Sequence, residues 1–305
     1  MKKNLFIVVI LCLVLVAVPV VEAEDHGQFF DSSHDVGKLT ARFLKLARHN
    51  NEKGGDSTIL ISPEGKVMLI DSGNSGAFTH IDHVLTVLGI SKIDYLVASH
   101  SHTDHIGSFT QLIDAYEIGQ VYTSELEYPE SYSNSYTRAM DAVKAKQIPH
   151  IVLVDGDSFT FGEEVLVEVL HPTAGIEYYE EYPLHSTAFI NNLSLVLKIT
   201  FGESSFLFGG DLYRGAEVEL VERHGDKLDV DVLKVNHHGE DTSSYSDFRQ
   251  AVSARIAVIM HDAIPDQSVY QKFIREGTDT YVTSIDGNVL VSTAGDGEYT
   301  VVLQH

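Results

Sequence analysis

The chain has 305 residues, of which 44% are hydrophobic and 21% charged, and its formal net charge is -23. This composition is typical of a folded globular protein and excludes a disordered or low-complexity chain. The excess of negative charge repels polyanions, so nucleic-acid binding over a broad surface is disfavoured.

The amino terminus has the pattern of an export signal. Lys2 and Lys3 precede an apolar run over residues 5–21, and Val21-Glu22-Ala23 is typical of a signal-peptidase site. Residues 1–23 are therefore predicted to be a signal peptide. Alternatively they form an uncleaved N-terminal anchor, because the apolar run is nearly long enough to span a bilayer. In either case we expect a secreted or extracytoplasmic protein with no other membrane domain.

The rest of the chain is predicted to form one domain. Residues 24–38 are interpreted as a loosely held lead-in and residues 39–305 as the folded domain, because no repeat or Pro/Ser-rich linker divides them. The sole cysteine, Cys12, lies in the apolar run. After removal of residues 1–23 the chain would have no thiolate, so a bound metal ion would need His, Asp or Glu ligands.

Strand and helix patterns alternate along this domain. A hairpin is expected first, because Pro63-Glu64-Gly65 separates two apolar runs. The βα alternation that follows predicts an α/β fold in which two mixed sheets are covered by helices. In chain order, the predicted strands are 57–62, 66–71, 93–99, one near 121, 151–154, 165–170, 194–200, 205–208, 230–235, 256–260, 288–292 and 298–302. The predicted helices lie near 80–88, from about 106, at 135–146, from about 247 and near 269–275.

Three segments rich in metal-binding side chains each follow a predicted strand. Loops at the carboxyl ends of strands often carry functional residues, so we expect the three segments to form one site. They are residues 99–107, with His100, His102, Asp104 and His105; residues 208–211, ending in Asp211; and residues 234–239, with His237 and His238.

Imidazole and carboxylate ligands suit zinc, and manganese is an alternative. His100 and His102 can hold one ion from an extended loop, while Asp104 and His105 on the next turn can hold a second. Asp211 can bridge both ions, although taken alone it is an ordinary cap for a helix that begins near residue 215. Two divalent ions ~3.5–4 Å apart would activate a shared hydroxide for attack on a substrate.

These motifs resemble those of the metallo-β-lactamase superfamily, whose His-x-His-x-Asp-His signature is matched in full by residues 100–105. The resemblance runs from about residue 42 to residue 302, almost the entire chain after the predicted signal peptide. It implies a four-layer αββα sandwich and a site with two divalent metal ions, and it gives Asp211 the role of bridging acid. Asp71 resembles the family's early aspartate, which braces the metal loop from behind.

Within that superfamily, residues 191–197, 206–211 and 234–239 resemble the hydrolase domain of ComEC-type competence proteins and the phosphorylcholine esterases. The resemblance implies hydrolysis of an ester, with a phosphodiester as the leading substrate class. Asn191 stands where many family members have a third histidine, which leaves one metal ion less fully ligated. His185 could replace that ligand, or it could support the site from behind or lie on the surface.

The adjacent histidines 237 and 238 have different expected roles. One should bind metal while the other faces the substrate or a supporting residue, and the sequence does not order them. Asp104 could also assist proton transfer, so Asp104, His237 and His238 are the candidate catalytic residues. His261, which follows another predicted strand, either lines the pocket or stabilises a loop, and His171 is interpreted as structural.

Aromatic and acidic residues cluster between the metal-binding motifs. Tyr128, Tyr132, Tyr136 and residues 177–182 could form a rim that favours a cationic group such as choline by cation–π contact. The alternative is a solvated loop beside an ordinary helix face.

The leading functional hypothesis is a secreted binuclear metallohydrolase that acts on a small-molecule or polymer-linked phosphodiester. Two alternatives are hydrolysis of a lactone or lactam and cleavage of extracellular nucleic acid. An alternative from another class is a metal-binding module without turnover. The sequence does not predict the oligomeric state.

Overall fold

The computed structural model describes residues 27–124, 134–175, 183, 186–263 and 265–304. Several predictions concern residues outside this part of the chain and stay untested. They are those for the signal segment, His185, Tyr128, Tyr132 and residues 177–182. Within the described part, none of the helices has the length and apolar character needed to cross a bilayer.

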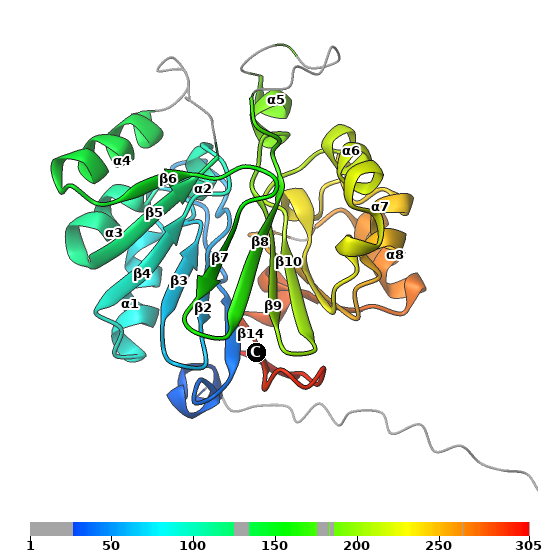
Figure 1. Cartoon of the computed structure of the whole chain (residues 1–305), viewed down its shortest axis with the longest axis horizontal. Coiled ribbons are helices and arrows are strands. Elements are labelled where there is room, and N and C mark those ends of the chain that lie inside the picture. Colours follow the sequence, from blue (N-terminus) through cyan, green and yellow to red (C-terminus); the bar gives the residue numbers. More distant parts are fainter. Residues whose placement is uncertain (1–26, 125–133, 176–182, 184–185, 264, 305) are drawn as a thin grey trace, which may run out of the picture.

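Two mixed sheets form the centre of the molecule (Figure 1). The first is eight-stranded, in the order β15-β14-β1-β2-β3-β4-β5-β6, and it is parallel from β3 to β6 and antiparallel elsewhere. Its strands are β1 (Leu39–Phe43), β2 (Thr58–Ile61), β3 (Val67–Ile70), β4 (Lys92–Val97), β5 (Glu117–Thr123), β6 (His150–Val152), β14 (Val289–Thr293) and β15 (Thr300–Leu303).

The second sheet is seven-stranded, in the order β13-β12-β11-β10-β9-β8-β7. It is parallel from β13 to β10 and antiparallel from β10 to β7. Its strands are β7 (Ser158–Phe161), β8 (Val165–His171), β9 (Val196–Phe201), β10 (Ser204–Phe208), β11 (Val232–Lys234), β12 (Ile256–Ile259) and β13 (Asp279–Val282).

Helices cover the outer faces of both sheets (Figure 1). The core under the first sheet includes residues of α1, α3 and α4, and the core under the second includes residues of α6, α7 and α8. The predicted αββα sandwich is therefore confirmed. The helices are α1 (Phe78–Val87), α2 (Thr103–Ile106), α3 (Phe109–Ala115), α4 (Asn134–Ala145), α5 (Thr187–Asn191), α6 (Arg214–His224), α7 (Ser246–Val252), α8 (Gln267–Glu276) and α9 (Thr283–Asp286). Short 3-10 turns occupy Gln28–Phe30, Ser32–His34, Gly225–Leu228 and Asn236–Gly239.

The period-two pattern of the strands divides their side chains between two cores. In β10, Phe206 and Phe208 face the other sheet, whereas Leu207 faces the helices. Across the gap, the rings of Phe43 and Phe208 stack with their centroids 5.9 Å apart. Each such side chain contributes about 1.5–3 kcal/mol when fully buried. The two sheets are thus joined by a continuous apolar layer.

Several elements were not predicted from the sequence. Strand β1 was missed because the buried side chain of Arg42 interrupts its apolar pattern. The guanidinium of Arg42 donates to Asp35 Oδ1 at 2.6 Å and to the Phe29 carbonyl at 3.0 Å. Phe29 is fully buried, so the described part of the lead-in is packed onto the domain rather than loosely held. Strands β7 and β13 and helices α5 and α9 were also missed, because each has only four or five residues and so offers too short a pattern.

The parallel strands direct the predicted motifs to one edge of the sandwich. Strands β3 and β4 of the first sheet are parallel, as are β10, β11 and β12 of the second. Asp71 follows β3 and residues 99–105 follow β4. Asp211 follows β10, and the histidine pair follows β11.

Candidate metal centre

The three predicted motifs meet around the carboxylate of Asp211. Asp211 Oδ2 lies 3.2 Å from His105 Nε2 and 3.3 Å from His238 Nε2. His100 Nε2 approaches the same oxygen at 3.9 Å. One carboxylate oxygen is therefore shared by side chains from both sheets, which is the geometry expected of a bridging acid.

Two groups of possible ligands surround Asp211. In the first, His100 Nε2 and His102 Nδ1 are 3.0 Å apart. In the second, His238 Nε2 lies 3.4 Å from Asp104 Oδ2, and His105 lies beside them. Each group could hold one cation, with Asp211 contributing to both.

The donor atoms at the centre of this cluster fit a metal ion. Within the described residues, His105 Nε2 and His238 Nε2 are buried and have no hydrogen-bond partner. Leaving a buried polar atom unsatisfied costs about 1–3 kcal/mol. Cations bound by these nitrogen and carboxylate ligands would remove that cost, and the ligand set is the one that zinc and similar divalent ions prefer.

The charges of the cluster favour cation binding. His105 and His238 lower the pKa of Asp211 well below its usual range, although burial alone would raise it. Burial lowers the pKa of His100 well below its usual range, so that ring is neutral and can donate a lone pair. Burial would also lower the pKa values of His105 and His238, but Asp211 and neighbouring carboxylates raise both well above the ordinary range. Metal binding at the second group should therefore release protons.

Asp71 holds the first metal-binding loop in place. Its backbone lies in the left-handed region at φ 60°. Its Oδ1 accepts from the Ser99 amide at 2.7 Å, and its Oδ2 lies 2.8 Å from His105 Nδ1. The His105 ring is thereby oriented with Nε2 toward Asp211. This position agrees with the bracing role that the resemblance implied.

The backbone that leads into β2 packs tightly against the first metal-binding motif. Asp56 N donates to the Asp104 carbonyl at 3.1 Å. A Cβ on the preceding Gly55, whose φ is +77°, would lie 1.7 Å from that carbonyl oxygen. Glycine is required here because only a residue without a side chain allows both this φ and this approach.

The structure shows which of the two adjacent histidines faces the cluster. Both lie in the left-handed region, with φ 45° for His237 and φ 53° for His238. His238 is buried and faces Asp104 and Asp211. His237 is half-buried, its Nδ1 is 2.5 Å from Thr242 Oγ1, and its ring centroid is 4.7 Å from that of Tyr213. Burial lowers the pKa of His237 to about 4, so the ring is neutral near neutral pH.

The remaining predicted residues lie around this centre. Asn191 is fully buried on α5. Burial lowers the pKa of His102, and the Asn191 side chain opposes that shift. His261 lies farther out, with its ring centroid 6.3 Å from that of His238 and its Nε2 3.5 Å from Glu240 Oε1. His171 is buried away from the cluster, with its Nε2 2.7 Å from the Asn192 carbonyl, which agrees with a structural role. Tyr136 is partly buried and packs against the core under the first sheet, and the cationic-rim hypothesis stays a prediction.

Sequence reasoning did not single out Asp56, Lys234 or Glu217 as site residues. Asp56, His105, Asp211 and His238 offer ligand atoms that all lie within 4.8 Å of one another. We nevertheless regard Asp104, not Asp56, as the ligand, because the Asp56 oxygens face His238 Nδ1 and Lys234 Nζ. The position of Lys234 in the strand pattern could have indicated its buried location. Val232 and Lys234 alternate with Leu233, so the charged side chain occupies a strand position that faces the other sheet.

Glu217 on α6 secures the loop that carries the histidine pair. Its Oε1 accepts from Asn236 Nδ2 at 2.8 Å and from the Ser244 amide at 2.8 Å. Its Oε2 accepts from the Tyr245 amide at 3.2 Å. Burial raises the pKa of Glu217 to about 7, although these hydrogen bonds oppose the shift.

Replacing Glu217 with Gln should flatten the pH dependence of stability. The folded-state pKa is about 7 and the ordinary value is 4.5, so the folded protein binds this proton more tightly than the unfolded chain. The stabilising contribution is therefore fully present below the ordinary pKa and is lost as the pH rises through the folded-state pKa. Relative to E217Q, the native protein should lose roughly 3 kcal/mol of unfolding free energy over that window. Urea unfolding of both metal-free proteins across the window measures this, and parallel profiles would contradict it.

The fold and the His/Asp cluster define a protein of the metal-dependent hydrolase class. Residues 52–177 match the family model for the metallo-beta-lactamase superfamily. The chain is similar to this superfamily over those residues, in agreement with the resemblance of its motifs, and it is also similar to ComEC-type proteins.

Two curated relatives carry that second similarity. The competence protein ComA of Neisseria gonorrhoeae is 28% identical over 68% of this chain, and ComE operon protein 3 of Bacillus subtilis is 27% identical over 57%. The matched regions cover only 26% and 21% of those relatives. The solved structure of a mutant of CmlA, a β-hydroxylase of Streptomyces venezuelae, covers 84% of this chain and is itself covered to 53%, with a TM-score of 0.50 and 13% identity. At that identity the likeness concerns the fold alone.

Proposed function

We propose that the chain is an extracytoplasmic hydrolase that cleaves a phosphodiester with two divalent cations, zinc or manganese. The observation that carries this proposal is the sharing of Asp211 Oδ2 by His105 and His238, at 3.2 and 3.3 Å. The location is a prediction from residues 1–23, and the substrate class follows from the ComEC-like motifs. Two divalent cations at such a site lower the pKa of bound water and stabilise the negative charge that develops during phosphoryl transfer.

The protein's own residues divide into two ligand sets. His100 and His102 would hold one cation, with Asn191 beside them as a possible oxygen donor. Asp104, His105 and His238 would hold the other, and Asp211 would bridge the two. Asp104 is the least buried of these acids, with 21% of its side chain exposed, so it is also the one best placed to exchange a proton with a substrate.

His237 is proposed to bind the substrate rather than a cation. If the Thr242 hydroxyl donates to Nδ1, the ring proton resides on Nε2, which can donate a hydrogen bond to a phosphoryl or leaving-group oxygen. The neutral ring suits this role, because a positively charged ring beside two cations would be repelled.

Replacing His237 and His238 separately should therefore have different effects. His237→Ala should keep its metal content but lower kcat by about 100-fold, the lower end of the range for a lost hydrogen-bond donor to the transition state. His238→Ala should lose one of the two cations. Elemental analysis and steady-state kinetics on the two variants check this. Loss of metal from the His237 variant alone would reverse the assignment.

A substrate screen tests the proposed function. The purified protein, loaded with zinc or manganese, would be assayed on bis(nitrophenyl) phosphate, single-stranded DNA, a lactone and a β-lactam. We expect the simple phosphodiester to be the fastest substrate. A faster lactone or lactam would replace the phosphodiester proposal, a faster DNA substrate would favour a nuclease, and bound metal without turnover on all four would favour a metal-binding module.

A further inference from the structure

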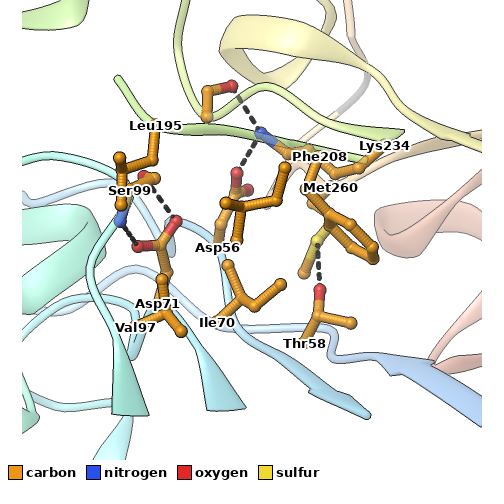
Figure 2. A pocket seen from close by; sticks show the side chains of 12 residues that line it. Asp56, Thr58, Ile70, Asp71, Val97, Ser99, Leu195, Phe208, Lys234 and Met260 are labelled. Atoms are coloured by element: carbon orange, nitrogen blue, oxygen red, sulfur yellow. Dashed lines mark hydrogen bonds and ion pairs between the residues drawn. The ribbon is translucent and has the colours of Figure 1, made fainter. Parts of the chain in front are cut away.

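A buried ion pair lies directly behind the candidate metal ligands. Asp56 precedes β2 and Lys234 ends β11, and each residue is 3% exposed. Figure 2 shows the two side chains pointing toward each other, and Lys234 Nζ forms an ion pair with Asp56 Oδ2. The same ammonium donates to the Gly210 carbonyl at 2.9 Å. The pair therefore connects the segment before β2 of the first sheet to the segment after β10 of the second.

The other oxygen of Asp56 contacts a candidate ligand. Asp56 Oδ1 is 3.0 Å from His238 Nδ1, on the side of the ring opposite the cluster. A carboxylate at this nitrogen keeps the proton on Nδ1 and leaves the lone pair of Nε2 for a cation. The Met260 carbonyl lies 3.2 Å from the same nitrogen and is a weaker competing acceptor.

Lys234 also acts on the bridging acid. Its Nζ lies 3.8 Å from Asp211 Oδ1, whereas Asp211 Oδ2 is the oxygen that faces the histidines. The ammonium is thus placed to hold Asp211 by the oxygen that points away from those rings.

Apolar residues make up much of the cavity lining beside the pair. It borders a cavity of about 10 Å³ between the sheets, which has room for no more than one water molecule. Phe208 and Met260 are among the apolar residues that line this cavity, and Thr58, Asp71 and Ser99 are polar residues in the same lining. A buried ion pair in such a place is weak evidence for stability, because an apolar pair of similar volume is often as stable or more so. Its contacts with His238 and Asp211 point instead to a role at the metal centre.

We propose that Asp56 and Lys234 are positioning residues that orient His238 and Asp211 for binding the second cation. Asp56 fixes the tautomer and ring angle of His238. Lys234 keeps Asp56, the Gly210 carbonyl and Asp211 Oδ1 in fixed positions relative to one another. The proposal rests on the proposed metal-dependent function, and it concerns metal affinity rather than turnover.

Two double variants test this proposal as a matched pair. D56N/K234M and D56A/K234M both remove the two buried charges, but only the amide in D56N/K234M keeps an acceptor for His238 Nδ1. Chelator competition with Co²⁺ should show the second cation site of D56N/K234M weakened by about 10-fold relative to the native protein, because the lysine that holds Asp211 is lost. In D56A/K234M, the second site should be weakened by about 10- to 100-fold relative to D56N/K234M, the range measured for lost partners of metal-binding histidines.

The native protein provides a second measurement that needs no variant. In the Co²⁺- or Zn²⁺-loaded form, NMR should show a slowly exchanging proton on His238 Nδ1. Equal affinity of the two double variants, or a native His238 that lacks the Nδ1 proton, would overturn the proposal. If the native protein binds no divalent cation, the proposed function fails too. If the native protein binds two cations and the variants bind them equally well, only the positioning role fails.

Discussion

Asp211→Asn should reduce phosphodiester hydrolysis by about 1000-fold and remove most of the bound metal. The carboxylate is buried and faces His100, His105 and His238 at 3.9, 3.2 and 3.3 Å. An amide of the same shape carries no charge to compensate the cations. Breaking a buried charge pair costs about 3–5 kcal/mol, and each 1.4 kcal/mol corresponds to about a factor of ten.

Kinetics and elemental analysis on purified D211N measure both effects. Asp94→Asn is a matched control, because Asp94 lies near the start of β4, at the opposite end of that strand from the metal-binding loop, where it accepts from the Val67 amide at 3.1 Å. It should keep native activity and metal content. Activity of D211N within 10-fold of the native protein would show that Asp211 is not the bridging acid.

Removal of metal should abolish activity and lower the melting temperature by about 10 °C. Four buried or mostly buried carboxylates, those of Asp56, Asp71, Asp104 and Asp211, lie close together near the ammonium of Lys234. Without cations, this cluster depends on protonated imidazoles for neutrality. A cation present at about 1000 times its Kd stabilises the folded state by about 4 kcal/mol, and each kcal/mol raises the melting temperature of a domain this size by about 2–4 °C.

Calorimetry and activity assays before and after chelation measure these changes. Addition of Zn²⁺ or Mn²⁺ should restore both quantities, whereas Ca²⁺ should restore neither, because calcium prefers a shell made only of oxygen atoms. A chelated protein that keeps its melting temperature and its activity would contradict the metal-dependent function.

The sequence predicted most of the sheet strands and the convergence of the candidate site side chains for one physical reason. Residues 100–105 and Asp211 directly follow apolar strands, so a local pattern reports both the element and the side chains at its end. The order of His237 and His238 could not be predicted. It depends on two successive left-handed backbone conformations, which are uncommon for residues other than glycine. Similarly, Asp56 and Lys234 become partners only because β2 and β11 face each other across the two sheets.

The candidate ligands come from both halves of the sandwich. His105 follows β4 of the first sheet, whereas Asp211 and His238 follow β10 and β11 of the second. A bound cation would therefore cross-link the two sheets. A small displacement of one sheet against the other, for example after truncation of Phe208 in the layer between them, would therefore weaken metal binding before either sheet unfolds.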